Sequence, residues 1–158
     1  MSRSGRVVRH LGALVVAAAL VGGCSKSPTP GGTTTTALRG ALPFDASPSA
    51  KKLSKVAGLE FPESMADYRS VRVADNELDV TFTMSPDDVA AFAEGTGLDP
   101  LTPGKLIIIH PSPIWDLDPG GTVESGQSVH DGLVRQVEVV TVPGQDARTV
   151  RLLVATDA

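Results

Sequence analysis

The sequence predicts an α+β fold in two layers, an antiparallel sheet of four to five strands with one or two short helices on one face. In residues 78–84, LDVTFTM, apolar and polar side chains alternate, which is the period of a strand with one buried and one solvent-facing side. Residues 133–142 and 149–157 flank the turn-like PGQDAR and predict a hairpin. No alternation of strands and helices is visible, which argues against a parallel sheet.

Each element of this fold has its own signal in the chain. Residues 51–58 predict a short helix that ends at Gly58, and residues 67–84 predict two strands around a turn at Asp75 and Asn76. The alternating charges of residues 71–79 suit a strand face in contact with solvent.

A second helix is predicted directly after residue 84. Ser85 is a good N-cap, Pro86 suits the first helical position, and Asp87 and Asp88 favour the positive helix start. Gly95 predicts its end. The two aspartates could also be read as a paired carboxylate site, but their place at a helix start already explains them.

The C-terminal half begins with a compact apolar segment. Residues 105–113, KLIIIHPSP, predict a strand closed by proline. Residues 116–133 are rich in Gly, Asp and Ser and predict a long loop before the final hairpin.

The N-terminus has the pattern of a secretory signal peptide. Residues 1–10 are basic, and residues 11–21, LGALVVAAALV, are apolar but far shorter than the ~20 residues of a membrane-spanning helix. A buried N-terminal core helix is the alternative, but the run has no polar face. No twin-arginine pair precedes the run, which favours the general secretory route.

The only cysteine of the chain, Cys24, follows this apolar run. With one cysteine no intramolecular disulfide can form. Residues 21–24, VGGC, resemble the lipobox of bacterial lipoproteins, with an aliphatic residue three positions before the cysteine and a small residue directly before it. The resemblance implies cleavage before Cys24 and attachment of a diacylglyceryl group to its sulfur. A free thiol after an ordinary signal peptide is the alternative.

These features divide the chain into three parts: the signal peptide 1–23, Cys24 with a disordered tether rich in Ser, Thr, Pro and Gly through residue 50, and one domain over 51–158. Part of the tether, ALRGALPF, is apolar enough to dock onto the domain. Removal of residues 1–23 takes away three arginines and no acid, so the net charge changes from −4 to −7. This acidity argues against nucleic acid as a partner.

The chain lacks the common catalytic motifs, and the sequence assigns no catalytic residue, metal or cofactor. Two histidines in the C-terminal half lie near acidic residues and the only tryptophan, and the weak binding candidates are His110, Trp115, Asp116, Asp118 and His130. Two histidines and a carboxylate could bind zinc if the fold joined them, and Ser112 or Ser128 could complete a hydrolase triad. A structural role for all of them in turns and the core is the plainer interpretation.

The order of FPESMADYRSVRV, the helix-start segment, a Trp-containing loop and a final hairpin resembles uncharacterised lipoproteins of actinobacteria. Together with the lipobox, this resemblance implies a lipoprotein anchored to the extracytoplasmic face of the membrane. We expect a binding or interaction module of the cell envelope whose partner is an envelope protein or a small ligand. The alternative is an envelope hydrolase or metal-binding protein that uses the region of His110 and His130.

Overall fold

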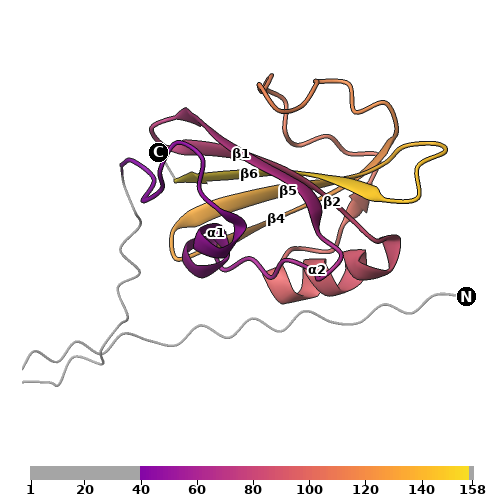
Figure 1. The fold of residues 1–158 in the computed structure, drawn as a ribbon, viewed down its shortest axis with the longest axis horizontal. Helices are drawn as coiled ribbons and strands as arrows, with labels where there is room; N and C mark the ends of the chain where they lie inside the picture. Colours follow the sequence, from indigo (N-terminus) through magenta and orange to yellow (C-terminus); the bar gives the residue numbers. More distant parts are fainter. Residues whose placement is uncertain (1–39, 157–158) are drawn as a thin grey trace, which may run out of the picture. The chain divides into compact units, whose positions relative to one another are not determined.

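The computed structural model describes residues 40–156, which form one six-stranded antiparallel sheet and two short helices (Figure 1). The strand order is β1-β2-β6-β5-β4-β3, so the final hairpin lies in the centre of the sheet. The α+β class is confirmed, but the sheet has six strands and not four to five. Their bounds are β1 (Ala66–Ala74), β2 (Glu77–Met84), β3 (Thr102–Pro103), β4 (Thr122–His130), β5 (Leu133–Thr141) and β6 (Arg148–Thr156).

The helices α1 (Ala50–Ala57) and α2 (Val89–Thr96), the latter preceded by the 3-10 turn η1 (Pro86–Asp88), lie on one side of the sheet (Figure 1). The apolar side chains of β2 predicted to face inward are fully buried there. The main core comprises Leu42, Phe44, Leu53, Ala57, Leu59, Leu78, Val80, Phe82, Met84, Phe92, Leu133, Val137, Val139, Val150, Leu152 and Val154. We call this side of the sheet the helix face.

The ends of α1 follow the capping signals, whereas those of α2 do not: the Ser85 hydroxyl accepts the Asp87 amide at 3.3 Å and so caps η1, and the N-cap of α2, Asp88, makes no side-chain cap hydrogen bond. The Ser49 hydroxyl accepts a hydrogen bond from the Lys52 amide at 3.4 Å, and Gly58 ends α1 in the left-handed conformation, as predicted. The prediction that α2 ends at Gly95 is wrong. The helix continues to Thr96, because Gly97, with φ 65°, adopts the left-handed cap and its amide donates to the Glu94 carbonyl at 2.9 Å.

The folded part begins earlier than the expected boundary at residue 51. Leu42 and Phe44 are buried in the main core, so the end of the predicted tether docks on the domain. The Leu42 amide donates to the Asp75 carbonyl at 2.8 Å, and the Arg72 amide donates to the Ala46 carbonyl at 2.7 Å. This segment therefore covers part of the outer edge of β1, which would otherwise present unpaired amides.

The predicted loop over residues 116–133 is wrong in its second half, because β4 occupies Thr122–His130. All nine residues of β4 pair with β5. Asp131 and Gly132 form a two-residue turn with φ 48° and 80°, the left-handed values of a tight hairpin connection. The polar composition of β4, TVESGQSVH, concealed the strand from a search for apolar alternation.

The predicted strand over residues 105–113 is also wrong. The only strand next to it in the described part of the chain is the two-residue β3, which precedes the apolar segment. The amides of Ile107 and Ile108 donate to the Glu138 carboxylate at 2.7 and 2.8 Å. The Glu138 side chain of β5 therefore accepts the two amide hydrogen bonds that a neighbouring strand would otherwise accept.

Within residues 40–156 no helix is both long enough and apolar enough to span a membrane. The signal peptide, Cys24 and most of the predicted tether lie outside the described residues.

Candidate functional site

The side of the sheet opposite the helix face carries buried charges. Asp79 and Glu138 are 0% exposed, and Arg151 is 2% exposed. Because successive side chains of a strand point to opposite faces, the burial of Leu78 and Val80 on the helix face places Asp79 on the other side. The expectation that this side is in contact with solvent is therefore wrong at these positions. We call it the polar face.

Glu138 and Arg151 stand directly opposite each other on β5 and β6 and form an ion pair, with 3.3 Å between Glu138 Oε2 and Arg151 Nη1. The other oxygen of Glu138 accepts the amides of Ile107 and Ile108, and Arg151 Nη2 donates to the Ile108 carbonyl at 3.5 Å. The apolar segment predicted to be a strand is therefore the cover of this ion pair.

Trp115 packs on the same ion pair. The Arg151 guanidinium carbon lies 5.3 Å from the centre of the indole ring, a cation–π distance. The indole N–H donates to the His110 carbonyl at 3.5 Å. The tryptophan therefore packs on the polar face and has no part in the main core.

His110 lies between two carboxylates of β2. Its Nε2 is 2.9 Å from Asp79 Oδ1, and its Nδ1 is 3.3 Å from Glu77 Oε1. His110 and Glu77 are partly exposed, whereas Asp79 is buried. Among residues 40–156 these three side chains form the one group of His, Cys, Asp or Glu that could hold a metal ion, with one ligand atom from each within 4.8 Å of the others.

The other predicted site residues do not join His110. His130 pairs with the core residue Leu133 and its ring lies against Gly58 at the end of α1, on the helix face. Its Nε2 is 3.7 Å from the exposed carboxylate of Asp131. A common site of His110 and His130 is therefore excluded by the fold, because the sheet separates them. Within residues 40–156 no hydrogen bond joins His130 to Ser112, Ser128 or Asp116.

The two aspartates near Trp115 are exposed. Asp118 accepts the Gly120 amide at 2.9 Å and so caps its own turn, which is the plainer interpretation considered above. Asp116 lines a shallow hollow beside Trp115 and Arg151.

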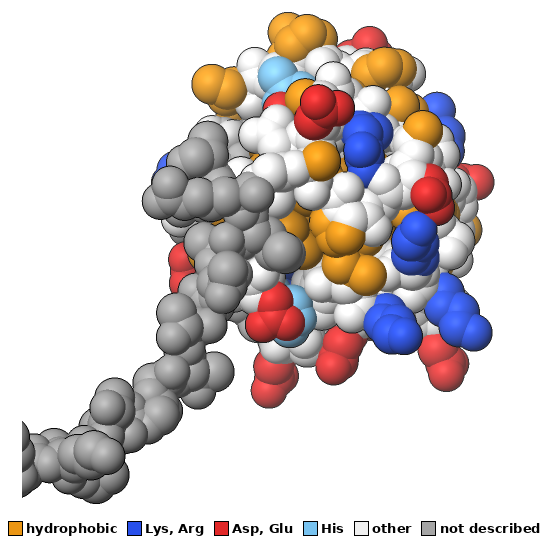
Figure 2. All heavy atoms as spheres, turned by 90° about the vertical axis from the view of Figure 1, so that its left-hand side faces the viewer, with side chains coloured by type: hydrophobic (Ala, Val, Ile, Leu, Met, Phe, Trp, Pro, Cys, Tyr) orange, Lys and Arg blue, Asp and Glu red, His pale blue; other side chains and the backbone are white. Residues whose placement is uncertain are grey.

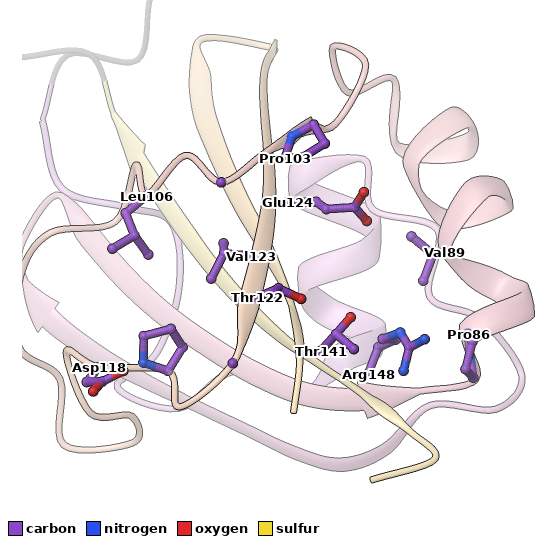
Figure 3. Close-up of a pocket in the computed structure, with 13 residues that line it drawn as sticks. Pro86, Val89, Pro103, Leu106, Asp118, Thr122, Val123, Glu124, Thr141 and Arg148 are labelled. Atoms are coloured by element: carbon purple, nitrogen blue, oxygen red, sulfur yellow. The ribbon is translucent and has the colours of Figure 1, made fainter. Parts of the chain in front are cut away.

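A groove of about 700 Å³ lies at the start of β4, where residues 118–121, the start of β6 and η1 meet (Figure 3). Apolar lining comes from Val89, Leu106 and Val123. Glu124 and Arg148 supply opposite charges on the α2 side of β4, and no ion pair joins these two residues. Of the predicted site residues only Asp118 lines it. Sequence reasoning missed the groove because its residues come from separate segments that share no motif.

The buried Arg135 contacts the end of α1. Arg135 Nη1 donates to the carbonyls of Ala57 and Gly58 at the end of α1, at 2.9 and 2.8 Å, and burial lowers the pKa of its guanidinium.

On the face shown in Figure 2, basic side chains lie beside acidic ones and form no separate patch.

No protein family, no curated protein and no solved structure shows significant similarity to this chain.

Proposed function

We propose that the protein is a lipid-anchored lipoprotein of the extracytoplasmic membrane face, whose domain acts as a binding module. The basic start, the short apolar run and the sequence VGGC before the only cysteine support the anchor. Two acyl chains hold a protein on a membrane. The chain without its signal peptide has a net charge of −7 and gains little from anionic lipid, so the covalent lipid would supply the attachment.

Mass spectrometry of the membrane fraction tests the anchor. We expect a mature N-terminus at Cys24 that carries acyl chains, and a soluble product from Cys24→Ala with the same domain fold. An unmodified wild-type protein that starts at another residue would contradict the anchor and leave the binding proposal intact.

The observation that carries the binding function is the groove together with Leu106, an exposed apolar side chain of its lining. Leu106, Ile109 and Leu117 are 48%, 82% and 52% exposed, and all three belong to the segment between β3 and β4. Leu106 also lines the groove. A concave surface with an exposed apolar side chain in its lining is typical of a binding site.

Site-specific photo-crosslinking in cells tests this surface. A photoreactive residue at Leu106 or Leu117 should give a discrete adduct, whereas the same residue at the exposed Val73 or Val129 should give none. A further variant, Arg148→Glu, reverses the one positive charge of the groove lining and should weaken the Leu106 adduct. Equal adducts at all four positions, or none at Leu106 and Leu117, would contradict the proposal.

The alternative of a hydrolase or metal site shared by His110 and His130 lacks support in the geometry, since the two histidines lie on opposite faces of the sheet.

A further inference from the structure

The inference concerns the contact between the start of β2 and the segment that covers the polar face. Glu77 and Asp79 are two residues apart on β2 and therefore point to the same side of the sheet. His110 approaches both from the covering segment, with contacts of 2.9 Å to Asp79 and 3.3 Å to Glu77. A nitrogen donor and two carboxylates thus meet where two parts of the chain join.

Asp79 has few partners for a buried carboxylate. A fully buried carboxylate needs a partner of opposite charge or a set of hydrogen bonds. Only His110 contacts Asp79 Oδ1, and Asp79 Oδ2 has no hydrogen-bond partner within residues 40–156. Arg151, the buried cation of the same face, already pairs with Glu138. The buried carboxylate therefore has one side-chain partner, His110, and one oxygen without any within the described residues.

We propose that Glu77, Asp79 and His110 bind a first-row divalent cation, with zinc as the reference ion. Zinc takes imidazole nitrogen and carboxylate oxygen at about 2.0–2.2 Å, so two ligands of one tetrahedral ion are about 3.4 Å apart. One ion takes one ring nitrogen of His110, and the distance of 2.9 Å between Nε2 and Asp79 Oδ1 is close to this value. Glu77 contacts the other ring nitrogen at 3.3 Å, but one ligand atom from each of the three side chains lies within 4.8 Å of the others, so the partly exposed Glu77 would turn toward the ion. The partner-free Asp79 Oδ2 offers the ion a further oxygen.

The three side chains differ in how firmly they are held. Asp79 is fixed by burial, while Glu77 and His110 are partly exposed and can adjust around an ion. With three protein ligands, a fourth position remains for water or for a group of a binding partner. The ion would join the covering segment to β2 and so fix the exposed Ile109, the residue before His110.

Trp115 provides a built-in reporter. It is the only tryptophan of the chain, and its ring centre lies 5.9 Å from that of His110. A paramagnetic ion at His110 should therefore quench its fluorescence. The fluorescence signal comes from Trp115 alone, whereas calorimetry and Co²⁺ absorption report any ion bound by the chain.

The experiment uses the full chain purified with a histidine-free tag and treated with chelator. Zn²⁺ is titrated by calorimetry, and Co²⁺ is titrated while Trp115 fluorescence and visible absorption are recorded. We expect one equivalent of Zn²⁺, and Co²⁺ quenching that excess Zn²⁺ reverses. His110→Gln and Glu77→Gln should weaken both signals about ten-fold or more. These two side chains are partly exposed, so their variants keep the fold even where Asp79→Asn does not.

His130→Gln and Glu63→Gln serve as matched controls, since these side chains lie outside the cluster. Both should bind zinc as the wild type does. Absence of zinc binding and of Co²⁺ quenching in the wild type would overturn the proposal. Unchanged binding in His110→Gln would overturn it equally.

Discussion

The two faces of the central sheet are built on different principles. On the helix face, Leu152 and Val154 of β6 pack against apolar side chains, and each contact can be exchanged for another of similar volume. On the polar face, Arg151 of the same strand depends on one carboxylate, one carbonyl and one indole ring. Burial of charge is tolerated there only because the partners are in place.

This difference changes the expected response to mutation. A deletion on the helix face leaves a cavity, and the loss scales with the missing volume. A deletion on the polar face leaves a partner charged and buried, and the loss is set by the partner that remains. The packing of the covering segment 105–115 should change only in response to mutations on the polar face.

The largest effect is expected for Arg151→Met. This variant keeps most of the side-chain volume but leaves Glu138 buried without its cation, which should reduce the free energy of unfolding by about 3–5 kcal/mol. Urea unfolding followed by circular dichroism measures the loss. The double variant Arg151→Met/Glu138→Gln removes the unpaired charge and should recover part of it. A single variant as stable as wild type would show that the ion pair is not buried in solution.

A comparable loss with a different cause is expected for Leu152→Ala. This residue is fully buried on the helix face, so its truncation should cost about 2–5 kcal/mol. Leu153→Ala is the matched control, because the next residue of β6 points to the polar face and is only partly buried. Its loss in the same urea measurement should be clearly smaller. Equal losses would contradict the assignment of the two faces.

The smallest effect on stability is expected from the ionisation of Tyr68 at high pH. Burial raises the pKa of this phenol, whose hydroxyl donates to the Pro48 carbonyl at 2.9 Å. The folded state therefore keeps the proton to a higher pH than the unfolded chain. The resulting stability is fully present below about pH 10, which is the pKa of tyrosine in the unfolded chain. It is lost as the pH rises through the pKa of Tyr68 in the folded state.

Thermal melts of wild type and Tyr68→Phe between about pH 9 and pH 11 test this dependence. The wild type should lose its advantage over the variant as the pH rises. A difference between the two proteins that stays constant over this range would show that Tyr68 does not titrate differently in the two states.

The helix face could be predicted from the sequence. The alternation of apolar side chains along LDVTFTM and the apolar residues of the final hairpin are direct signals of burial. The polar face could not. The alternation predicts that Asp79 faces solvent, and nothing in the sequence marks Glu138 or Arg151 as buried. KLIIIHPSP is predicted to be a strand. The two errors have one cause, since the apolar segment is the cover that buries these charges.

The candidate site shows the same limit. Its histidine could be selected from the sequence by residue type, but its partners could not, because Glu77 and Asp79 lie about thirty residues away and carry the pattern of an ordinary strand. The strand β4 and the groove beside it were missed for a related reason, since TVESGQSVH has little apolar character. Only long-range pairing with β5 makes this segment a strand.

Amide hydrogen exchange at Ile107 and Ile108 tests the account of the polar face most directly. Both amides belong to an irregular segment and donate to one buried carboxylate, so they should exchange slowly in the wild type. In Glu138→Ala their protection should fall, while the amides of β2 and β6 next to Leu152 should stay protected. Fast exchange of Ile107 and Ile108 in the wild type would contradict the account, because the segment would then not cover the buried charges.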